Sequence, residues 1–396
     1  MRAVFIKGPS RYDATRRFTD ELAAAFAHKG HEAVVVDIVG PDDIGAALRA
    51  AAQAPTNLVH TYGILGDAQA LLGQSLGEIF AAPHVLQHVD YPLSHLNQLE
   101  VTPRETVILT VDPSHVEAIH GTFGPDHFAH VAFCPHAAVG QRVEADPDVD
   151  AFVDQRPIPI LFAGSFHGVG PAPWVEEGRG IRQIFDRALD LALGTEFLPA
   201  LEALDQALRS YGEDPAHPRY ERMRRYATWV HEQARELRRQ ALLELAGQAG
   251  LPVFCVGAGY EGWIERHKSF RLGPPMTLAD TVALMRRARV VLNANANFGR
   301  GSHERPLSAM LAGAAVVTDG AWWSQQFEPG REVLSYRWTR LESDLAGLAT
   351  LVDNPEVAHA IGQAGQARAV AAHRFEHRVD AVIAAALAPV LTPLLT

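Results

Sequence analysis

Cysteine is nearly absent from this sequence, which contains only Cys134 and Cys255 among 396 residues. Two cysteines so far apart exclude a disulfide framework and a cysteine-rich metal site, and we interpret both as buried free thiols in a reducing compartment. Long apolar runs are absent too. None approaches the roughly 18 residues of a transmembrane helix, and the run in the amino-terminal MRAVFIKGPS is too short for a signal peptide. We therefore expect a cytoplasmic protein without a transmembrane segment.

Clusters of positive charge and metal-ligand motifs are also missing. The net charge of -11 and the lack of a Lys/Arg-rich run argue against a general nucleic-acid binder. The 19 histidines are scattered without an HExxH spacing, so we infer no metal. What remains is ordinary for a globular enzyme: 47% apolar residues, 20% charged residues and a length that accommodates two domains.

The first part of the chain alternates short apolar runs with amphipathic helices. Residues 3–6 predict a buried parallel strand, and a helix follows that Gly30 ends. A second strand at residues 33–36 completes a β-α-β unit, which is typical of doubly wound α/β folds. Asp37 stands where a dinucleotide-binding fold has its acidic residue, but the preceding loop lacks GxGxxG, which disfavours NAD binding.

Polar side chains follow the later strands of this half. Four further strands are predicted, at residues 57–60, 84–88, 106–111 and 130–133. Because ligands of open α/β sheets bind at the carboxyl ends of the strands, we expect one polar rim there. The side chains expected to face it are His60, His88, Asp90, His95 and His136. The alternative for any single histidine is a structural role, with its ring bonded to the backbone.

A second alternating series begins after residues 140–157, a polar and acidic segment that we interpret as a linker between domains. The strand at residues 158–162 is followed by Gly164 and Ser165, a small-residue turn where a phosphate or ribose can approach the backbone. An ordinary tight turn is the alternative. Residues 174–248 interrupt the alternation and predict a helical insertion of two to four helices, which would either bind an acceptor or partner or have no binding role.

The stretch Arg289–Asp319 predicts a strand, a polar loop, a helix and another strand. Pro306 suits the first turn of the helix, and Gly313 suits its end. The free N–H groups of such a helix start point beyond the carboxyl end of the preceding strand, where they favour an anion. In the loop, Asn293, Asn295 and Asn297 alternate, so we do not expect all three to face the same side.

Cationic side chains surround this helix start. Arg300, His303 and Arg305 lie in or next to it, and an arginine can bind a phosphate through two parallel hydrogen bonds. We therefore predict that the loop binds a diphosphate. The alternative is a solvated basic helix start.

The C-terminal half resembles a known family. The runs FRLGPPMTLADTVALMRRARVVLNANAN and HERPLSAMLAGAAVVTD are similar to glycosyltransferases of the GT-B fold, of the group 1 type, and within it to the spore-maturation CgeB-like branch. Residues 307–317 match a Leu-Glu-Ala-Met-Ala-x-Gly-x-Pro-Val-Val run, and the match is good over about residues 270–327. Where group 1 enzymes have the two Glu of an E-x7-E motif, this sequence has Arg300 and Ser308; Glu304 is the carboxylate that remains.

The resemblance implies an α/β protein of two Rossmann-like doubly wound domains that face a cleft. Residues 1–150 would form the acceptor-side domain, and residues 151–375 would form the nucleotide-sugar-binding domain, with the helical insertion at about 174–248. Residues 376–396 would form a C-terminal helix that packs back on the first domain.

The resemblance also implies a hexosyltransferase-like glycosyltransferase that moves a sugar from a nucleotide-diphosphate sugar, such as a UDP-sugar, to an acceptor hydroxyl, without metal or cofactor. The acceptor, a glycan, a protein or a small molecule, is left open. The residues expected to bind the donor are Gly164, Ser165, Leu272, Gly273, Arg300, His303, Glu304, Arg305 and Ser308.

The catalytic candidates are Asp90 as general base, His88 behind it, and Glu304 on ribose or sugar hydroxyls. A retaining reaction needs no base, and Asp90 would then orient the acceptor. Two alternatives remain. One is an epimerase or phosphorylase of the same fold, although no lysine suited to a pyridoxal Schiff base stands out. The other is a degenerate, non-catalytic transferase-like scaffold, which the loss of Glu at Ser308 favours.

Overall fold

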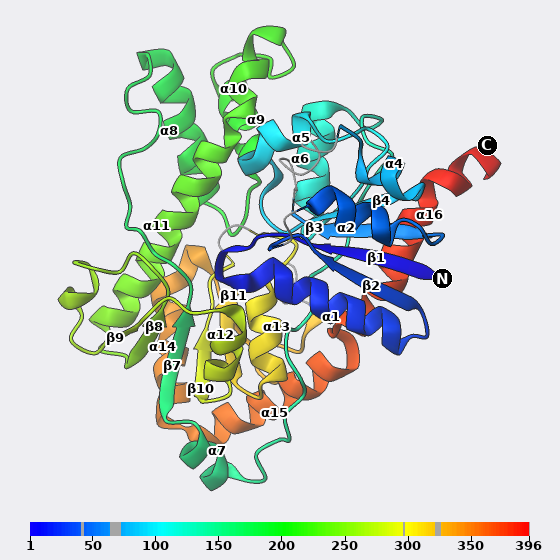
Figure 1. The fold of residues 1–396 in the computed structure, drawn as a ribbon. Helices are drawn as coiled ribbons and strands as arrows, with labels where there is room; N and C mark the ends of the chain where they lie inside the picture. Colours follow the sequence, from blue (N-terminus) through cyan, green and yellow to red (C-terminus); the bar gives the residue numbers. More distant parts are fainter. Residues whose placement is uncertain (41–42, 64–72, 296–297, 321–325, 396) are drawn as a thin grey trace. The chain divides into compact units, whose positions relative to one another are not determined.

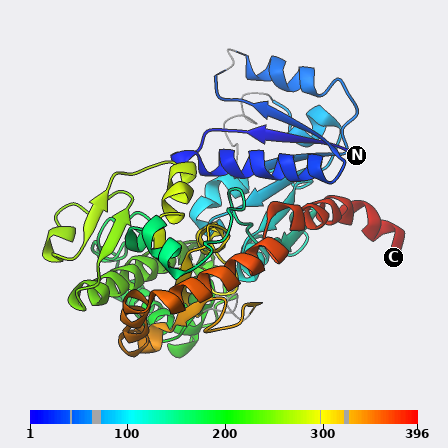
Figure 2. The same cartoon turned by 90° about the horizontal axis from the view of Figure 1, so that it is seen from below.

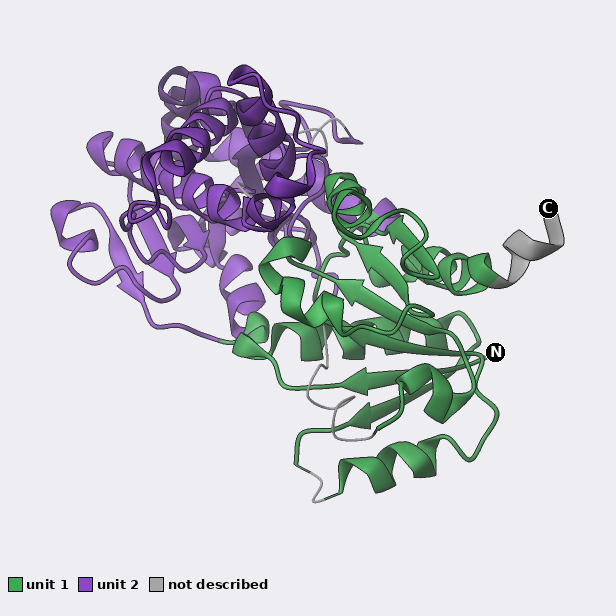
Figure 3. Cartoon of the chain, turned by 90° about the horizontal axis from the view of Figure 1, so that it is seen from above, with its two compact units in different colours: residues 1–139, 277–279, 373–396 green, residues 140–276, 280–372 purple. Residues whose placement is uncertain are grey.

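Two parallel six-stranded sheets organise the chain. The computed structural model describes residues 1–40, 43–63, 73–295, 298–320 and 326–395. The chain divides into unit 1, which comprises Met1–Val139, Thr277–Ala279 and His373–Thr396, and unit 2, which comprises Gly140–Met276 and Asp280–Ala372 (Figures 1 and 3). Both units have helices on parallel sheets, which confirms the predicted α/β fold class.

Unit 1 contains the first sheet. Its strands, in spatial order, are β2 (Glu32–Asp37), β1 (Arg2–Lys7), β3 (Leu58–Tyr62), β4 (His84–His88), β5 (Val107–Thr110) and β6 (His130–Phe133). Its helices are α1 (Ala14–His28), α2 (Ile44–Ala51), α4 (Leu76–Phe80), α5 (Leu96–Glu100), α6 (Pro113–Phe123) and α16 (Val379–Leu395). The strands β1, β3, β4 and β5 are almost wholly buried, as expected of parallel strands covered on both faces, although β3 and β4 include the polar His60, His84 and Gln87.

The C-terminal helix α16 belongs to unit 1, although it follows unit 2 in the sequence. It packs on β4, β5, β6 and α1 (Figure 2). The buried Arg378 fixes its start, because the guanidinium donates hydrogen bonds to the carbonyl oxygens of Pro135 at 3.0 Å and His136 at 2.9 Å. Lys29 also forms an ion pair with Asp380 at 2.6 Å.

Unit 2 contains the second sheet. Its strands, in spatial order, are β12 (Leu334–Tyr336), β11 (Ala315–Asp319), β10 (Ala288–Leu292), β7 (Ile158–Ala163), β8 (Val253–Val256) and β9 (Arg271–Gly273). Its helices are α7 (Val149–Gln155), α8 (Arg179–Leu193), α9 (Ala200–Ser210), α10 (Glu221–Arg225), α11 (Ala227–Gln248), α12 (Leu278–Met285, whose first two residues are assigned to unit 1), α13 (Glu304–Leu311), α14 (Leu341–Asp353) and α15 (Pro355–Ala372). One core on this sheet includes Phe162, Leu242, Val290 and Val317.

The strand order of unit 2 reverses between β7 and β10. The chain runs outward from β7 through β8 to β9, and then returns to the other side of β7 with β10, β11 and β12. The two central strands pair in parallel, with Phe162 beside Leu292. Such a topological switch point is where open α/β sheets bind ligands, just outside the carboxyl ends of the strands. A ligand is therefore expected to bind where the chain leaves β7 and β10.

Residues 140–157 begin at the boundary between the units, as the linker prediction places them, but they belong to unit 2 and are part of its structure. They include α7, in which Phe152 is fully buried. Asp146 and Arg156 form a buried ion pair at 2.9 Å, and Arg156 also donates to the carbonyl oxygens of Ala288 and Ala312. Asp146 and Arg156 can therefore be buried inside unit 2, because each of the two charges has a partner.

The described helices of residues 174–248 are α8, α9, α10 and α11, which pack on one another (Figure 1). Among the helices of the described residues, none is both long and apolar enough to cross a membrane.

Candidate functional site

The turn after β7 and the start of α13 meet at the switch point of unit 2. Arg305, in the first turn of α13, donates from Nη1 to the carbonyl oxygen of Ala163 at 2.6 Å. The same nitrogen is so close to Gly164 that a Cβ added there would lie 2.9 Å from it. Gly164, Ser165 and Arg305 are all partly exposed. The structure thus brings together three of the predicted donor-binding residues, with the guanidinium against the turn.

A second guanidinium reaches the same turn from α11. Arg239 donates from Nη1 to the carbonyl oxygen of Ser165 at 2.7 Å, and its Nε is buried without a hydrogen-bond partner among the described residues. Burial lowers the pKa of Arg239 to about 10, an effect that Glu236 opposes and Arg305 reinforces, so the side chain stays charged at neutral pH. Sequence reasoning missed this residue, because α11 carries several arginines and no local pattern distinguishes one of them.

Both charges face a turn that is itself rigidly held. The hydroxyl of Tyr260 donates to the carbonyl oxygen of Gly164, and the backbone N–H of Ala258 donates to Ser165 Oγ at 3.3 Å. Among the described residues, no carboxylate forms an ion pair with Arg305, and Arg239 has only Glu236, at 3.4 Å. Two guanidinium groups therefore converge with little compensating negative charge, which is an environment that favours a bound anion.

The loop before α13 is fixed by buried hydrogen bonds. The Asn295 side chain accepts a bond from the backbone N–H of His303, the N-cap of α13, at 3.1 Å. The backbone N–H of Asn295 in turn donates to Asp319 Oδ1 at 2.9 Å, and Trp338 donates to Asp319 Oδ2 at 3.1 Å. Burial raises the pKa of Asp319 above its ordinary value. The hydrogen bonds from Asn295 and Trp338 oppose this shift but do not cancel it. Asp319, the last residue of β11, thus ties the loop that follows β10 to the neighbouring strand.

The alternating asparagines do not alternate in direction. Asn293 and Asn295 are both buried, and both side-chain amides donate to the hydroxyl of Thr318, at 3.0 and 3.5 Å. Residues two apart in an extended chain face the same side, so the strand period gave no reason to expect these two asparagines to diverge. Asn297 lies outside the described residues.

The start of α13 holds the remaining candidates of this loop. Arg300, His303 and Glu304 are partly exposed, and the ring of His303 packs edge-on against Phe298 at 4.3 Å. Ser308 is fully buried, and its hydroxyl donates to the carbonyl oxygen of Glu304 at 2.9 Å, within the helix. Ala312 caps the helix and Gly313 follows with a φ of 80°, as the sequence predicts.

The candidates Leu272 and Gly273 lie on the edge strand β9, two strands away from β7 and therefore about 10 Å across the sheet. Leu272 is 40% exposed. A Cβ on Gly273 would lie 2.8 Å from Cζ of Phe254, so glycine is needed here for β9 to pack on β8. The structure does not bring these two residues to the Arg239–Arg305 pair.

In unit 1, a group of imidazoles surrounds Asp90 just beyond β4. The side chain of His95 lies 3.7 Å from the Asp90 carboxylate, and His88 Nδ1 lies 3.1 Å from the Asp90 carbonyl oxygen. Partial desolvation by the surrounding chain raises the pKa of Asp90, but the imidazoles of His95, His88 and His136 lower it by more, so the net shift is downward. Burial also lowers the pKa of His88 to about 4, so this ring is neutral at pH 7.

His60 does not lie on the rim that we expected it to share. It is the third residue of β3, pairs with Phe5 and Val85 in the sheet, and is fully buried. Its ring packs against Phe5 and Tyr62 at centroid distances of 5.8 and 4.8 Å. The predicted strand ended at His60, whereas β3 continues to Tyr62, and this moves the histidine from the edge of the sheet into its core.

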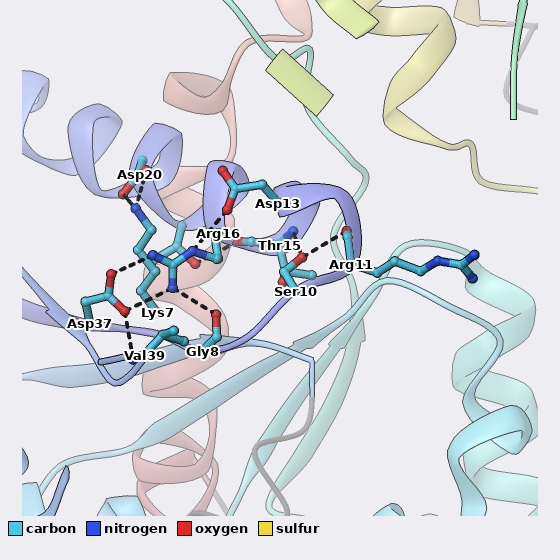
Figure 4. A network of polar contacts seen from close by, with 11 residues as sticks. Lys7, Gly8, Ser10, Arg11, Asp13, Thr15, Arg16, Asp20, Asp37 and Val39 are labelled. Carbon is cyan, nitrogen blue, oxygen red and sulfur yellow. Dashed lines mark hydrogen bonds and ion pairs between the residues drawn. The ribbon is translucent and has the colours of Figure 1, made fainter. Parts of the chain in front are cut away.

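The carboxylate of Asp37 at the end of β2 is occupied by a side chain of its own unit. Arg16 binds it through two hydrogen bonds, at 2.9 and 2.6 Å, and this contact lowers the pKa of Asp37 (Figure 4). Lys7, at the end of β1, pairs with Asp20 at 2.6 Å in the same network. The acidic residue that a dinucleotide fold offers to a ribose is thus engaged by an arginine.

Residues 235–384 match a family model described as glycosyl transferase-like. This match includes Arg239, Arg305 and the whole Asn293–His303 loop. A search among curated proteins found no match.

Solved structures resemble almost the full chain. An Anabaena protein, HepE, in complex with UDP and glucose gives a TM-score of 0.52 at 11% identity, over 96% of this chain and 98% of that chain. Sucrose-phosphate synthase from Thermosynechococcus elongatus gives 0.53 at 12% identity, over 97% and 96%. An alpha-glucosyltransferase in complex with UDP and a 13-mer DNA with a central A:G mismatch gives 0.54 at 11% identity, over 96% and 100%. The fold is therefore that of the GT-B glycosyltransferases.

Proposed function

We propose that this protein is a glycosyltransferase that transfers a sugar from a nucleotide-diphosphate sugar to an acceptor hydroxyl. Three observations support the proposal: the GT-B fold, the glycosyl transferase-like match over residues 235–384, and the cationic turn at the switch point of unit 2. UDP-sugars are the donors to test first, because two of the similar structures contain UDP. A hexosyl donor and membership of the CgeB-like branch are finer parts of the same proposal.

The observation that carries the proposal is the convergence of Arg239 and Arg305 on Gly164 and Ser165. Negative charge develops on the leaving diphosphate during glycosyl transfer, and fixed positive groups that are already in place stabilise it best. The two guanidinium groups and the N–H groups at the start of α13 supply this charge. We therefore propose that the reaction needs no metal ion.

Acceptor activation is assigned to unit 1. Asp90 is exposed, so an acceptor hydroxyl can reach its carboxylate, which is ionised at neutral pH, and we assign it the role of general base. Its lowered pKa weakens it as a proton acceptor, so the alternative role is to orient the acceptor in a retaining reaction. His95 would orient this carboxylate, and His88 would hold the backbone of Asp90. The expectation that the protein does not act on nucleic acid rests on the net charge of -11 and stays a prediction.

The experiment is a panel of nucleotide-diphosphate sugars, incubated with the protein in EDTA and assayed for release of the nucleoside diphosphate. Release from one donor, with transfer or hydrolysis of its sugar, supports a metal-independent transferase. Interconversion of the donor sugar without release would instead indicate an epimerase. Binding of a nucleotide sugar without any turnover would indicate the non-catalytic scaffold.

A further inference from the structure

The connection between α8 and α9 contacts the loop that precedes α13. This connection, residues 194–199, is called the insertion linker here. A Cβ added to Gly299 would overlap the ring of Phe197, so the ring lies directly on the backbone of the loop. Gly299 is buried, whereas Phe197 is partly exposed. The helical insertion thus reaches the loop that supplies Arg300 and His303.

The insertion linker is held firmly just before Phe197. The carboxylate of Glu196 accepts hydrogen bonds from the backbone N–H groups of Trp338 at 2.8 Å and Thr339 at 3.1 Å. Earlier in the same connection, Arg238 donates from Nη2 to the carbonyl oxygens of Ala192 at 2.8 Å and Thr195 at 2.6 Å. With its neighbours fixed in this way, Phe197 has little freedom to follow the loop if the loop moves.

The same anchor reaches the loop by a second route. Trp338, whose backbone binds Glu196, donates from its indole N–H to Asp319, and Asp319 accepts the backbone N–H of Asn295. Asn295 in turn accepts the N–H of His303. The insertion linker therefore supports the loop at two positions, at Asn295 through Trp338 and Asp319 and at Gly299 through Phe197, so the loop is not held by the sheet alone.

We propose that Phe197 is a positioning residue for the donor, which sets the place of the loop that carries Arg300 and His303. The helical insertion is then part of the donor site. The inference rests on the proposed function, because it concerns the same diphosphate site. It does not require Phe197 to touch the donor.

Gly299 provides a reciprocal test of the contact. Its φ lies outside the left-handed region, so alanine fits the backbone, and the three atoms nearest to an added Cβ all belong to the Phe197 ring. UDP serves as the probe, and its Kd is measured by calorimetry beside the melting temperature without UDP. We expect Phe197→Ala and Gly299→Ala each to raise the Kd about three- to thirtyfold. Phe197→Leu, which keeps an apolar partner on the loop, should retain most of the affinity.

The double variant separates this contact from general damage. If the methyl group of Gly299→Ala acts only through the ring, then Phe197→Ala/Gly299→Ala should bind UDP more tightly than the product of the two single effects predicts. Gly180→Ala and Tyr211→Ala are matched controls on the insertion: a Cβ on Gly180 meets nothing within 4 Å, and Tyr211 is 51% exposed. Both controls should leave the Kd unchanged.

Two results would overturn the inference, and they can be told apart. If the wild-type protein binds UDP and all Phe197 and Gly299 variants bind it equally well, even at lowered melting temperatures, the contact is only structural and the proposed function stands. If the wild-type protein binds neither UDP nor any other nucleoside diphosphate, the proposed function fails and the inference fails with it.

Discussion

Arg305 Nη1 lies 2.6 Å from the carbonyl oxygen of Ala163, a residue 142 positions earlier in the chain. The bond joins the first turn of α13 to the carboxyl end of β7 at the point where the strand order of the sheet reverses. A carbonyl oxygen carries no net charge, so this bond does not compensate the positive charge of the guanidinium as a carboxylate would. The contact therefore fixes the position of a cation beside the turn without neutralising it.

Gly164→Ala tests how closely this cation must approach the turn. The new Cβ would lie 2.9 Å from Arg305 Nη1, so the guanidinium must shift, whereas the backbone of Gly164 accepts alanine. We expect UDP binding to weaken by about 1 kcal/mol, since one charged hydrogen bond is disturbed but not removed. Calorimetry with UDP measures the change. An affinity equal to that of the wild type would show that the approach to Gly164 is not needed.

Arg239→Ala should weaken UDP binding by about 1.5–3 kcal/mol, the range for a hydrogen bond to a charged group. The loss should shrink as salt concentration rises, because the interaction is electrostatic. Arg331→Ala is the matched control, because the side chain of Arg331 is 70% exposed and paired with Glu328. If Arg239→Ala lowers the melting temperature and leaves the Kd unchanged, Arg239 supports the turn and does not bind the ligand.

Asp90→Asn should lower the rate of sugar transfer about 10²- to 10⁴-fold, the usual contribution of a general base. UDP binding should not change, because the donor site is assigned to unit 2. The exposed Asp126→Asn is the control for a surface carboxylate. If transfer by Asp90→Asn stays at the wild-type rate, Asp90 is not the base.

Three buried histidines of unit 1 predict loss of stability in acid. Burial lowers the pKa of His60 to about 3 and those of His84 and His88 to about 4, against 6.5 for the free side chain. Between these values and pH 6.5 the unfolded chain binds more protons than the folded chain. Stability is thus complete above pH 6.5 and falls as the pH drops, by about 1.4 kcal/mol per pH unit for each histidine.

Urea unfolding at pH 7 and pH 5 measures this slope. His60→Phe keeps the ring packing against Phe5 and Tyr62. It should make the free energy of unfolding depend less steeply on pH, because about one proton fewer is taken up on unfolding. The exposed His28→Gln should leave the slope unchanged. Equal slopes for all three proteins would contradict the burial argument for His60.

The meeting of Gly164 and Arg305 could be anticipated from the sequence. The strands before and after the loop are continuous apolar runs, which predict buried parallel strands, and the carboxyl ends of parallel strands share one edge of the sheet. The end of α13 at Gly313 was predictable for the same kind of local reason.

Other features depend on tertiary packing. On α11, Arg235 pairs with Glu236, Arg238 binds the end of α8, and only Arg239 reaches the turn after β7. Three arginines within five residues look alike in sequence, and the way the helix is rotated against the sheet decides among them. The polar segment 140–157 misled for a similar reason, because its charges at Asp146 and Arg156 satisfy each other inside the core.

The most direct test of the account is the Kd of UDP for the wild-type protein and for Arg305→Ala, measured by calorimetry in EDTA. The account predicts that the wild type binds UDP without a metal ion. It also predicts that Arg305→Ala binds UDP more weakly by about 1.5–3 kcal/mol, because a fixed charge beside the diphosphate is lost. An unchanged Kd for Arg305→Ala, or binding that depends on a divalent cation, would contradict it.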